Sequence, residues 1–177
     1  MLTVADAQHL VDLHLRDTPR AAHSRFVAHI MRRLAVLLGG DADLWEIVGL
    51  CHDLDFLVTS GDWNRHGLLT VEWLGDSIPA DARAAIASHD HRTGVRSDTL
   101  LADMLKLADA LAVIDQRAGR SVLADLDHRD PYPALRKRLG DHPHLADILE
   151  RCAGRHKLPF AGIVKVMGEV LPQDPSG

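Results

Sequence analysis

Apolar residues recur every three or four positions along most of the chain, which is the period of one face of an α-helix. The helical segments are separated by turn residues such as Gly39-Gly40 and by prolines suited to a first helical turn, such as Pro19. No stretch gives the alternating pattern of a half-buried strand. The chain is therefore predicted to be an all-α protein, a helical bundle.

Helices are expected over nine segments: Val4 to Arg16, Pro19 to Leu38, one from an Asp41 or Asp43 cap into His52-Asp53, Trp63 to Gly75, Ala80 to His89, one from Ser97 or Asp98 to Gly119, Pro133 to Leu139, His142 to Ala153, and Pro159 to Leu171. Their inward stripes include Leu37 and Trp73. The histidines at 128, 142, 144 and 156 share no face and are expected at the surface. Residues 173–177 are expected to form a frayed tail.

Length and composition favour one globular domain, with 177 residues of which 46% are hydrophobic and 25% charged. A helical core over residues 19–115 and a helical extension over 120–171 are expected. The net charge of -5 argues against general nucleic-acid binding. No apolar run approaches a membrane span and the start lacks a secretory signal, so no membrane partner and a cytoplasmic location are expected. Helical enzymes of this size often pair, so a homodimer stays open.

One short stretch, Gly49-Leu50-Cys51-His52-Asp53-Leu54-Asp55, places an imidazole and a carboxylate side by side in an apolar run. Burying a carboxylate without a partner is costly, and imidazole and carboxylate are standard ligands of divalent ions. Taken alone, the pair is more often a surface feature at a helix end. The helical period, however, places further polar residues at inward positions. The full inward set is His23, His52, Asp53, His66, His89 and Asp109.

Each of these residues alone is more often a satisfied core residue or a surface residue. Six of them on five successive segments are better explained by a metal site inside a helical bundle, to which facing helices contribute ligands. We therefore treat a metal site as the leading hypothesis.

At these residues the chain resembles the HD superfamily of metal-dependent phosphohydrolases, named for the doublet that stands here as His52-Asp53. The resemblance covers residues 19–114. Residues 22–27 look like the first-ligand helix, residues 50–55 like the signature helix, and residues 107–111 like the last-ligand helix. The histidines in Arg65-His66-Gly67 and Ser88-His89 match the extra ligands of members that hold two metals.

The resemblance implies that His23, His52, Asp53 and Asp109 hold one divalent ion. It also implies that Asp53 bridges to a second ion held by His66 and His89. Iron, manganese, nickel, cobalt, zinc and magnesium are all candidates for these ions.

The predicted activity is hydrolysis of a phosphoester or nucleotide by a metal-activated water. Asp53, Lys106 and Asp109 are the candidate catalytic residues. Arg65, His91, Arg92 and Lys106 are candidates for binding a small phosphorylated substrate, and Asp55 for orienting a ligand histidine. Two alternatives stay open. The same ligand pattern occurs in HD-fold mixed-valence di-iron oxygenases, and a non-catalytic nucleotide-binding or regulatory module is also consistent with it.

Overall fold

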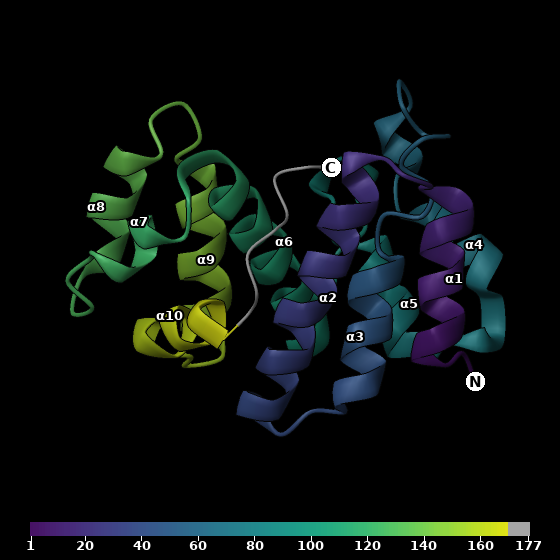
Figure 1. Ribbon diagram of the computed structural model, residues 1–177, viewed down its shortest axis with the longest axis horizontal. Helices are drawn as coiled ribbons and strands as arrows, with labels where there is room; N and C mark the ends of the chain where they lie inside the picture. Colours follow the sequence, from purple (N-terminus) through teal and green to yellow (C-terminus); the bar gives the residue numbers. More distant parts are fainter. Residues whose placement is uncertain (170–177) are drawn as a thin grey trace.

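The computed structural model describes residues 1–169, and within this range the chain forms helices and no strands (Figure 1). The prediction of an all-α protein is confirmed. The elements in chain order are α1 (Val4–His14), α2 (Pro19–Leu38), α3 (Ala42–Cys51), the 3-10 helix η1 (Trp63–Arg65), α4 (Leu68–Leu74), η2 (Gly75–Ser77), α5 (Ala80–Ala87), η3 (His91–Thr93), α6 (Leu100–Ala118), α7 (Ser121–Ala124), α8 (Pro131–Arg138), α9 (His144–Arg155) and α10 (Phe160–Glu169).

The bounds of α2 follow from the two residues that flank it in the predicted way. Pro19 occupies the first helical turn, where its missing N–H costs nothing. At the other end Gly39 adopts a left-handed φ of 74°, and its N–H bonds the carbonyl of Ala35. The prediction of this helix is confirmed at both ends.

Helices α2 and α3 pack closely because Gly49 has no side chain. A Cβ at this position would lie only 2.6 Å from the Cα of Ala28. The close approach brings the end of α3 beside the first half of α2, so that the rings of His23 and His52 lie 5.6 Å apart. The backbone packing therefore positions the first two candidate ligands.

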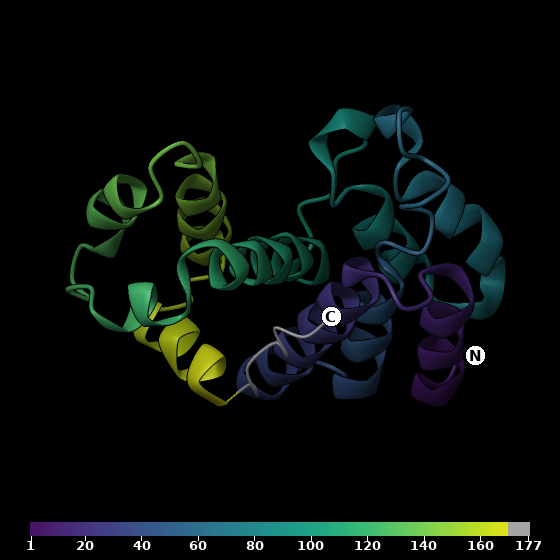
Figure 2. The same cartoon turned by 45° about the horizontal axis from the view of Figure 1, so that its top comes forward.

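Helix α6 runs through the middle of the molecule, with α2 and α5 packed on one part of it and α9 on another (Figure 2). Leu101, Leu105, Ala108 and Ala112 recur at the helical period on one face of α6, and all four are buried. The same helix therefore belongs both to the core near the N-terminus and to the layer formed by the C-terminal helices.

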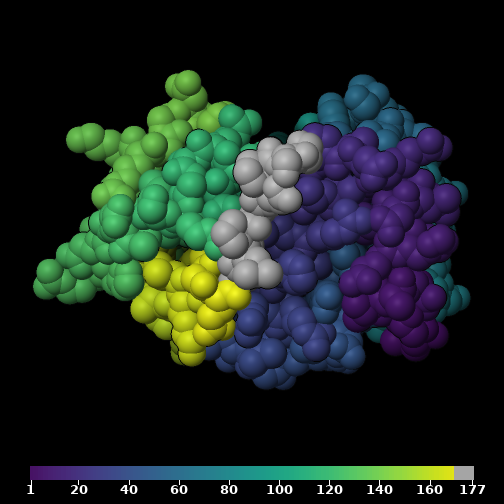
Figure 3. All heavy atoms as spheres, viewed as in Figure 1, coloured from purple at the N-terminus to yellow at the C-terminus, as the bar shows by residue number. Residues whose placement is uncertain are grey.

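The C-terminal helices α7 to α9 form a bulge beside the N-terminal half in the view of Figure 3. Helix α8 packs on α9, while α10 contacts α2. These helices correspond to the predicted extension, and the single-domain description stays a prediction. Residues 170–171 of the last expected helix and the expected tail at 173–177 lie outside the described residues.

Several local predictions were wrong. The helix expected from Trp63 to Gly75 is split, because Gly67 has a left-handed φ of 81° and resets the helical phase before α4. Trp73 is consequently 42% exposed and stacks on His14. The inward stripe of α2 ends at Leu34, and Leu37 is 42% exposed. Helix α7 was not expected.

One of the four histidines expected at the surface is instead part of a buried hydrogen-bond network. The ring of His156 contacts the carboxylate of Asp103, which is itself buried in α6. The helical period relates residues of the same helix only. It could not predict that His156 pairs with Asp103, which lies 53 residues earlier in the chain.

Within residues 1–169, no helix combines the length and the apolar character needed to cross a membrane.

Candidate metal centre

Two of the six candidate ligands lie within helices, and the other four follow helix ends. His23 lies in the second turn of α2, and Asp109 lies in the middle of α6. The other four follow helix ends: His52 and Asp53 directly follow α3, His66 follows η1, and His89 follows α5. The helical period placed His66 and His89 inward correctly, although both lie in turns. We call these six residues the candidate metal cluster.

Asp53 lies at the centre of the candidate metal cluster, and its two carboxylate oxygens face different partners. Oδ2 lies 3.3 Å from Nε2 of His52 and 3.8 Å from Nε2 of His23. Oδ1 lies 3.0 Å from Nε2 of His66 and 3.5 Å from Nε2 of His89. Asp109 joins the first side, because its Oδ1 lies 3.0 Å from Nε2 of His23. The carboxylate of Asp53 thus separates two groups of ligand atoms.

Three of the histidines are held so that Nε2 faces the cluster. Nδ1 of His52 lies 2.7 Å from the carbonyl of Gly49, and Nδ1 of His89 lies 2.7 Å from the carbonyl of Ile86. A carbonyl can only accept, so Nδ1 carries the proton in both rings and Nε2 is left to present a lone pair. This is the arrangement that orients a metal-ligating imidazole.

The third histidine is oriented by a side chain. Nδ1 of His66 donates to Oδ1 of Asp55 at 2.8 Å, while Oδ2 of Asp55 accepts from the backbone N–H groups of Gly67 and Thr70. Asp55 is fully buried. The sequence-based suggestion that Asp55 orients a ligand histidine therefore agrees with its position.

The donor set fits a metal ion. Nε2 of His52 is buried without a hydrogen-bond partner among the described residues, and such an atom is costly unless something accepts its lone pair. Nε2 of His66 and Nε2 of His89 also approach each other to 3.3 Å. Two lone pairs at this distance repel unless a proton or a cation lies between them. Two groups of three residues each bring their ligand atoms within 4.8 Å of one another. They are His23-His52-Asp109 and His52-Asp53-His89.

Burial and charge compete at this cluster. Burial alone raises the pKa of Asp53, but the charge of His52 and hydrogen bonds from the surrounding imidazoles hold that pKa well below its usual range. Burial lowers the pKa of His66, but its hydrogen bonds to Asp53 and Asp55 outweigh this and raise the pKa to about 9. Without a metal, protons therefore take the place of cations between the ligands.

Arg20, which was not predicted as a site residue, also contacts the cluster. Arg20 donates from its guanidinium to Oδ2 of Asp53 at 2.8 Å, and its guanidinium carbon lies 3.8 Å from the ring centroid of Phe56. Arg20 precedes His23 by three positions on α2, so the two side chains share a face. The three-residue spacing from His23 could have identified Arg20 from the sequence.

The predicted substrate-binding residues occupy different places. Lys106 and His91 line a cavity beside the cluster, and Lys106 donates to the carbonyl of Ser97 at 2.9 Å. Arg92 is paired with Asp90 and lies over Trp63, while Arg65 is exposed on η1. The roles of all four, like those of the ligands, stay predictions.

Comparison with known proteins gives one match. The family model described as HD domain matches residues 20–114 of this chain, which is more than half of it. Neither the curated proteins nor the solved structures gave a significant match.

Proposed function

Since the chain belongs to the HD domain family, a group of metal-dependent hydrolases, we propose that it is a phosphohydrolase whose Asp53 bridges two divalent ions. The observation that carries this proposal is the division of the Asp53 oxygens. Oδ2 faces His23 and His52, whereas Oδ1 faces His66 and His89. Asp53 would thereby contribute to holding both ions.

Two bound divalent ions would supply an activated water and neutralise the charge that develops on a phosphoryl group. His23, His52, Asp53 and Asp109 would hold one ion, and His66, His89 and Asp53 the other. The chain itself fixes the ligands before binding, because the Nδ1 atoms are held by acceptors outside the cluster. Little reorganisation of these side chains is then needed.

A substrate approaches this cluster from the side of Asp109. The carboxylate of Asp109 is 32% exposed, whereas the side chains of the other five candidate ligands are at most 7% exposed. Asp109 and His89 also line the adjoining cavity. Asp109 is therefore placed to accept a proton or a hydrogen bond from a water at the cluster, and Lys106 to contact an anionic substrate.

The decisive experiment measures metal content and hydrolysis together. The protein is purified at low oxygen without a metal-affinity column, its Fe, Mn, Ni, Co, Zn and Mg are quantified per chain, and a panel of phosphoesters and nucleotides is assayed. We expect about two ions per chain and release of phosphate. Asp53→Asn should lose metal and activity, whereas Asp130→Asn, an exposed carboxylate outside the cluster, should retain both.

Three outcomes would contradict the proposal. Retention of metal and activity by Asp53→Asn would remove Asp53 from the site. Two irons with a mixed-valence spin signal and oxygen consumption without phosphate release would favour the oxygenase. A nucleotide that binds tightly and is recovered unchanged would favour a non-catalytic binding module.

A further inference from the structure

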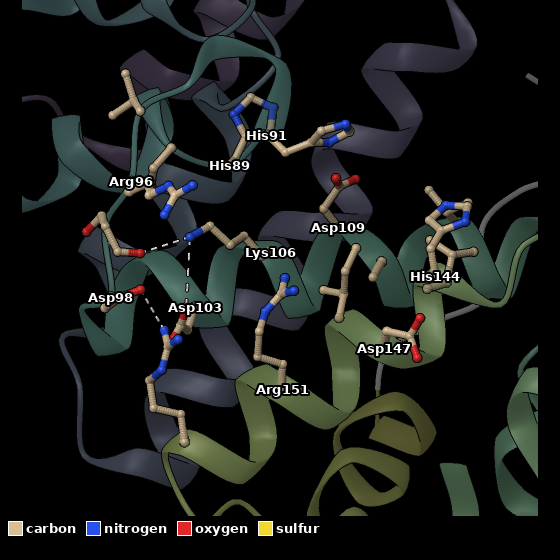
Figure 4. Close-up of a pocket in the computed structure, with 18 of the residues that line it drawn as sticks. His89, His91, Arg96, Asp98, Asp103, Lys106, Asp109, His144, Asp147 and Arg151 are labelled. Carbon is tan, nitrogen blue, oxygen red and sulfur yellow. Dashed lines mark hydrogen bonds and ion pairs between the residues drawn. The ribbon is translucent and has the colours of Figure 1, made fainter. Parts of the chain in front are cut away.

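A cavity of about 880 Å³ adjoins the candidate metal cluster between α6, α9 and the segment over residues 88–98 (Figure 4). Its wall includes His89 and Asp109 of the cluster. Small-molecule sites have volumes of about 300–1,000 Å³, so the cavity can hold a substrate that extends well beyond one phosphoryl group. The other side chains of the wall indicate which chemical group the substrate carries at the end away from the cluster.

Two arginines in this wall have no partner within residues 1–169. Arg96 comes from the segment before α6 and Arg151 from α9, and in Figure 4 both side chains extend toward the part of α6 that bears Lys106. Among the described residues, neither guanidinium makes a hydrogen bond or an ion pair. A single unpaired arginine at a surface is ordinary, but two that enter one cavity from different elements indicate a shared anionic partner.

The carboxylates of the cavity wall do not supply that partner, because each is already engaged. Asp98 and Asp103 both accept from Arg155 at 2.8 Å. Asp147 accepts from Arg136 at 2.7 Å. Asp109 belongs to the cluster. Among the described residues, no carboxylate of the wall therefore pairs with Arg96 or Arg151.

Lys106 adds a third cation to the wall of the cavity. Its ammonium group donates one hydrogen bond, to the carbonyl of Ser97, and lies 3.8 Å from Asp103. An ammonium has three donors, so further hydrogen bonds stay available. Guanidinium groups bind phosphate and carboxylate through paired N–H donors, which makes them suited to a fixed anionic group.

We propose that Arg96 and Arg151 bind a second anionic group, a phosphate or a carboxylate, of a small substrate whose reacting phosphoryl group lies at the candidate metal cluster. The inference rests on the proposed function and deepens it by naming the substrate class, which is a phosphoester with two separated anionic groups. Val113 and Ile148 also line the cavity and provide an apolar surface for the part of the substrate that joins the two groups.

The test compares three phosphoesters of matched length with the metal-loaded enzyme: propyl phosphate, 1,3-propanediol bisphosphate and 3-phosphooxypropanoate. We expect kcat/KM for at least one doubly anionic ester to exceed that for propyl phosphate by about tenfold or more, which corresponds to one charge-assisted contact. The ester that is preferred identifies the second group as phosphate or carboxylate. The double substitution Arg96→Gln with Arg151→Gln should bring this ratio close to one.

The control is Arg129→Gln, which removes one positive charge from an exposed loop that does not line the cavity. It should leave the ratio unchanged. An unchanged ratio in the double variant would overturn the inference. So would an equal loss for all three esters, because the arginines would then act on the reacting group itself.

A binding measurement separates this inference from the proposed function. Calorimetric titration with 1,3-propanediyl bisphosphonate, which has no ester bond to cleave, should show weaker binding to the double variant by tenfold or more. If no ester is turned over but this difference persists, phosphohydrolysis fails and the anion site stands. If propyl phosphate is cleaved but neither the preference nor the binding difference exists, the anion site fails alone.

Discussion

Asp55 and His66 are joined by a hydrogen bond of 2.8 Å between the carboxylate and Nδ1 of the ring, and both side chains are buried. Because the other oxygen of Asp55 binds two backbone N–H groups at the start of α4, the carboxylate is fixed with respect to the backbone. The ring of His66 therefore has one preferred orientation, with Nε2 directed at Asp53 and His89 of the candidate metal cluster.

The first prediction concerns this orientation. Asp55→Asn can turn an amide N–H toward Nδ1 of His66, and the ring would then move its proton to Nε2 and lose its ligand atom. We expect metal affinity to fall about 10- to 100-fold, as for other partners of ligating histidines. Metal titration monitored by calorimetry measures this, with Asp62→Asn at an exposed position as the control. Equal affinity in the two variants would argue against the role of Asp55.

The second prediction concerns the stability of the metal-free protein as a function of pH. The pKa of His66 is raised in the folded state from 6.5 to about 9, and that of His89 is raised as well. A raised pKa stabilises the fold fully below about pH 6.5, and this stabilisation is lost as the pH rises through about 9. For His66 the loss is about 3 kcal/mol.

Thermal unfolding of chelator-treated protein between pH 6 and pH 10 tests this expectation. The melting temperature should fall across that range, and bound metal should suppress the fall because it replaces the proton. A melting temperature that rises over the same range in the metal-free protein would contradict the sign of the effect.

The third prediction concerns the attachment of α9 to α6. Asp103 is 1% exposed and accepts hydrogen bonds at 2.8 Å from Arg155 and from His156. Asp103→Asn removes the buried charge and should destabilise the protein by about 2–4 kcal/mol. It should also raise KM for the preferred substrate, since α9 forms a wall of the cavity.

Denaturant unfolding and steady-state kinetics measure both effects. Asp98→Asn is the matched control, because Asp98 binds the same arginine but its side chain is 78% exposed. Its effect on stability should stay within about 0.5 kcal/mol. If the two variants are equally stable, Asp103 does not hold the helices together.

The fourth prediction compares two helical glycines. Gly49→Ala places a Cβ 2.6 Å from the backbone of Ala28, so α2 and α3 must separate, and a loss of about 1–3 kcal/mol is expected. Gly154→Ala in α9 meets nothing within 4 Å and should stabilise the protein by up to about 1 kcal/mol. Chemical denaturation gives both values, and the same sign for the two variants would refute the packing argument.

Features of the structure that depend on neighbouring residues in the chain could be predicted from the sequence. Pro19 and Gly39 act on the backbone next to them, so the ends of α2 were evident from the sequence. The inward positions of His23 and Asp109 followed from the helical period. The break at Gly67 was not predicted, because a left-handed glycine is recognised only when its φ is known.

The contacts of the cavity depend on tertiary structure and could not be predicted in this way. Asp103 meets Arg155 and His156 more than 50 residues further along the chain. The entry of Arg96 and Arg151 into one space likewise depends on how α9 crosses α6. No periodic signal in the sequence encodes that crossing.

The central position of α6 has an evolutionary consequence. The candidate metal cluster comes from residues 23 to 109, whereas much of the cavity wall comes from α9, and α6 is the helix that both parts share. Mutations on the face of α9 that lines the cavity can therefore change which molecules enter it without altering a residue of the candidate metal cluster. A chain built in this way can vary the lining of its cavity by drift in one helix while selection keeps the candidate metal cluster constant.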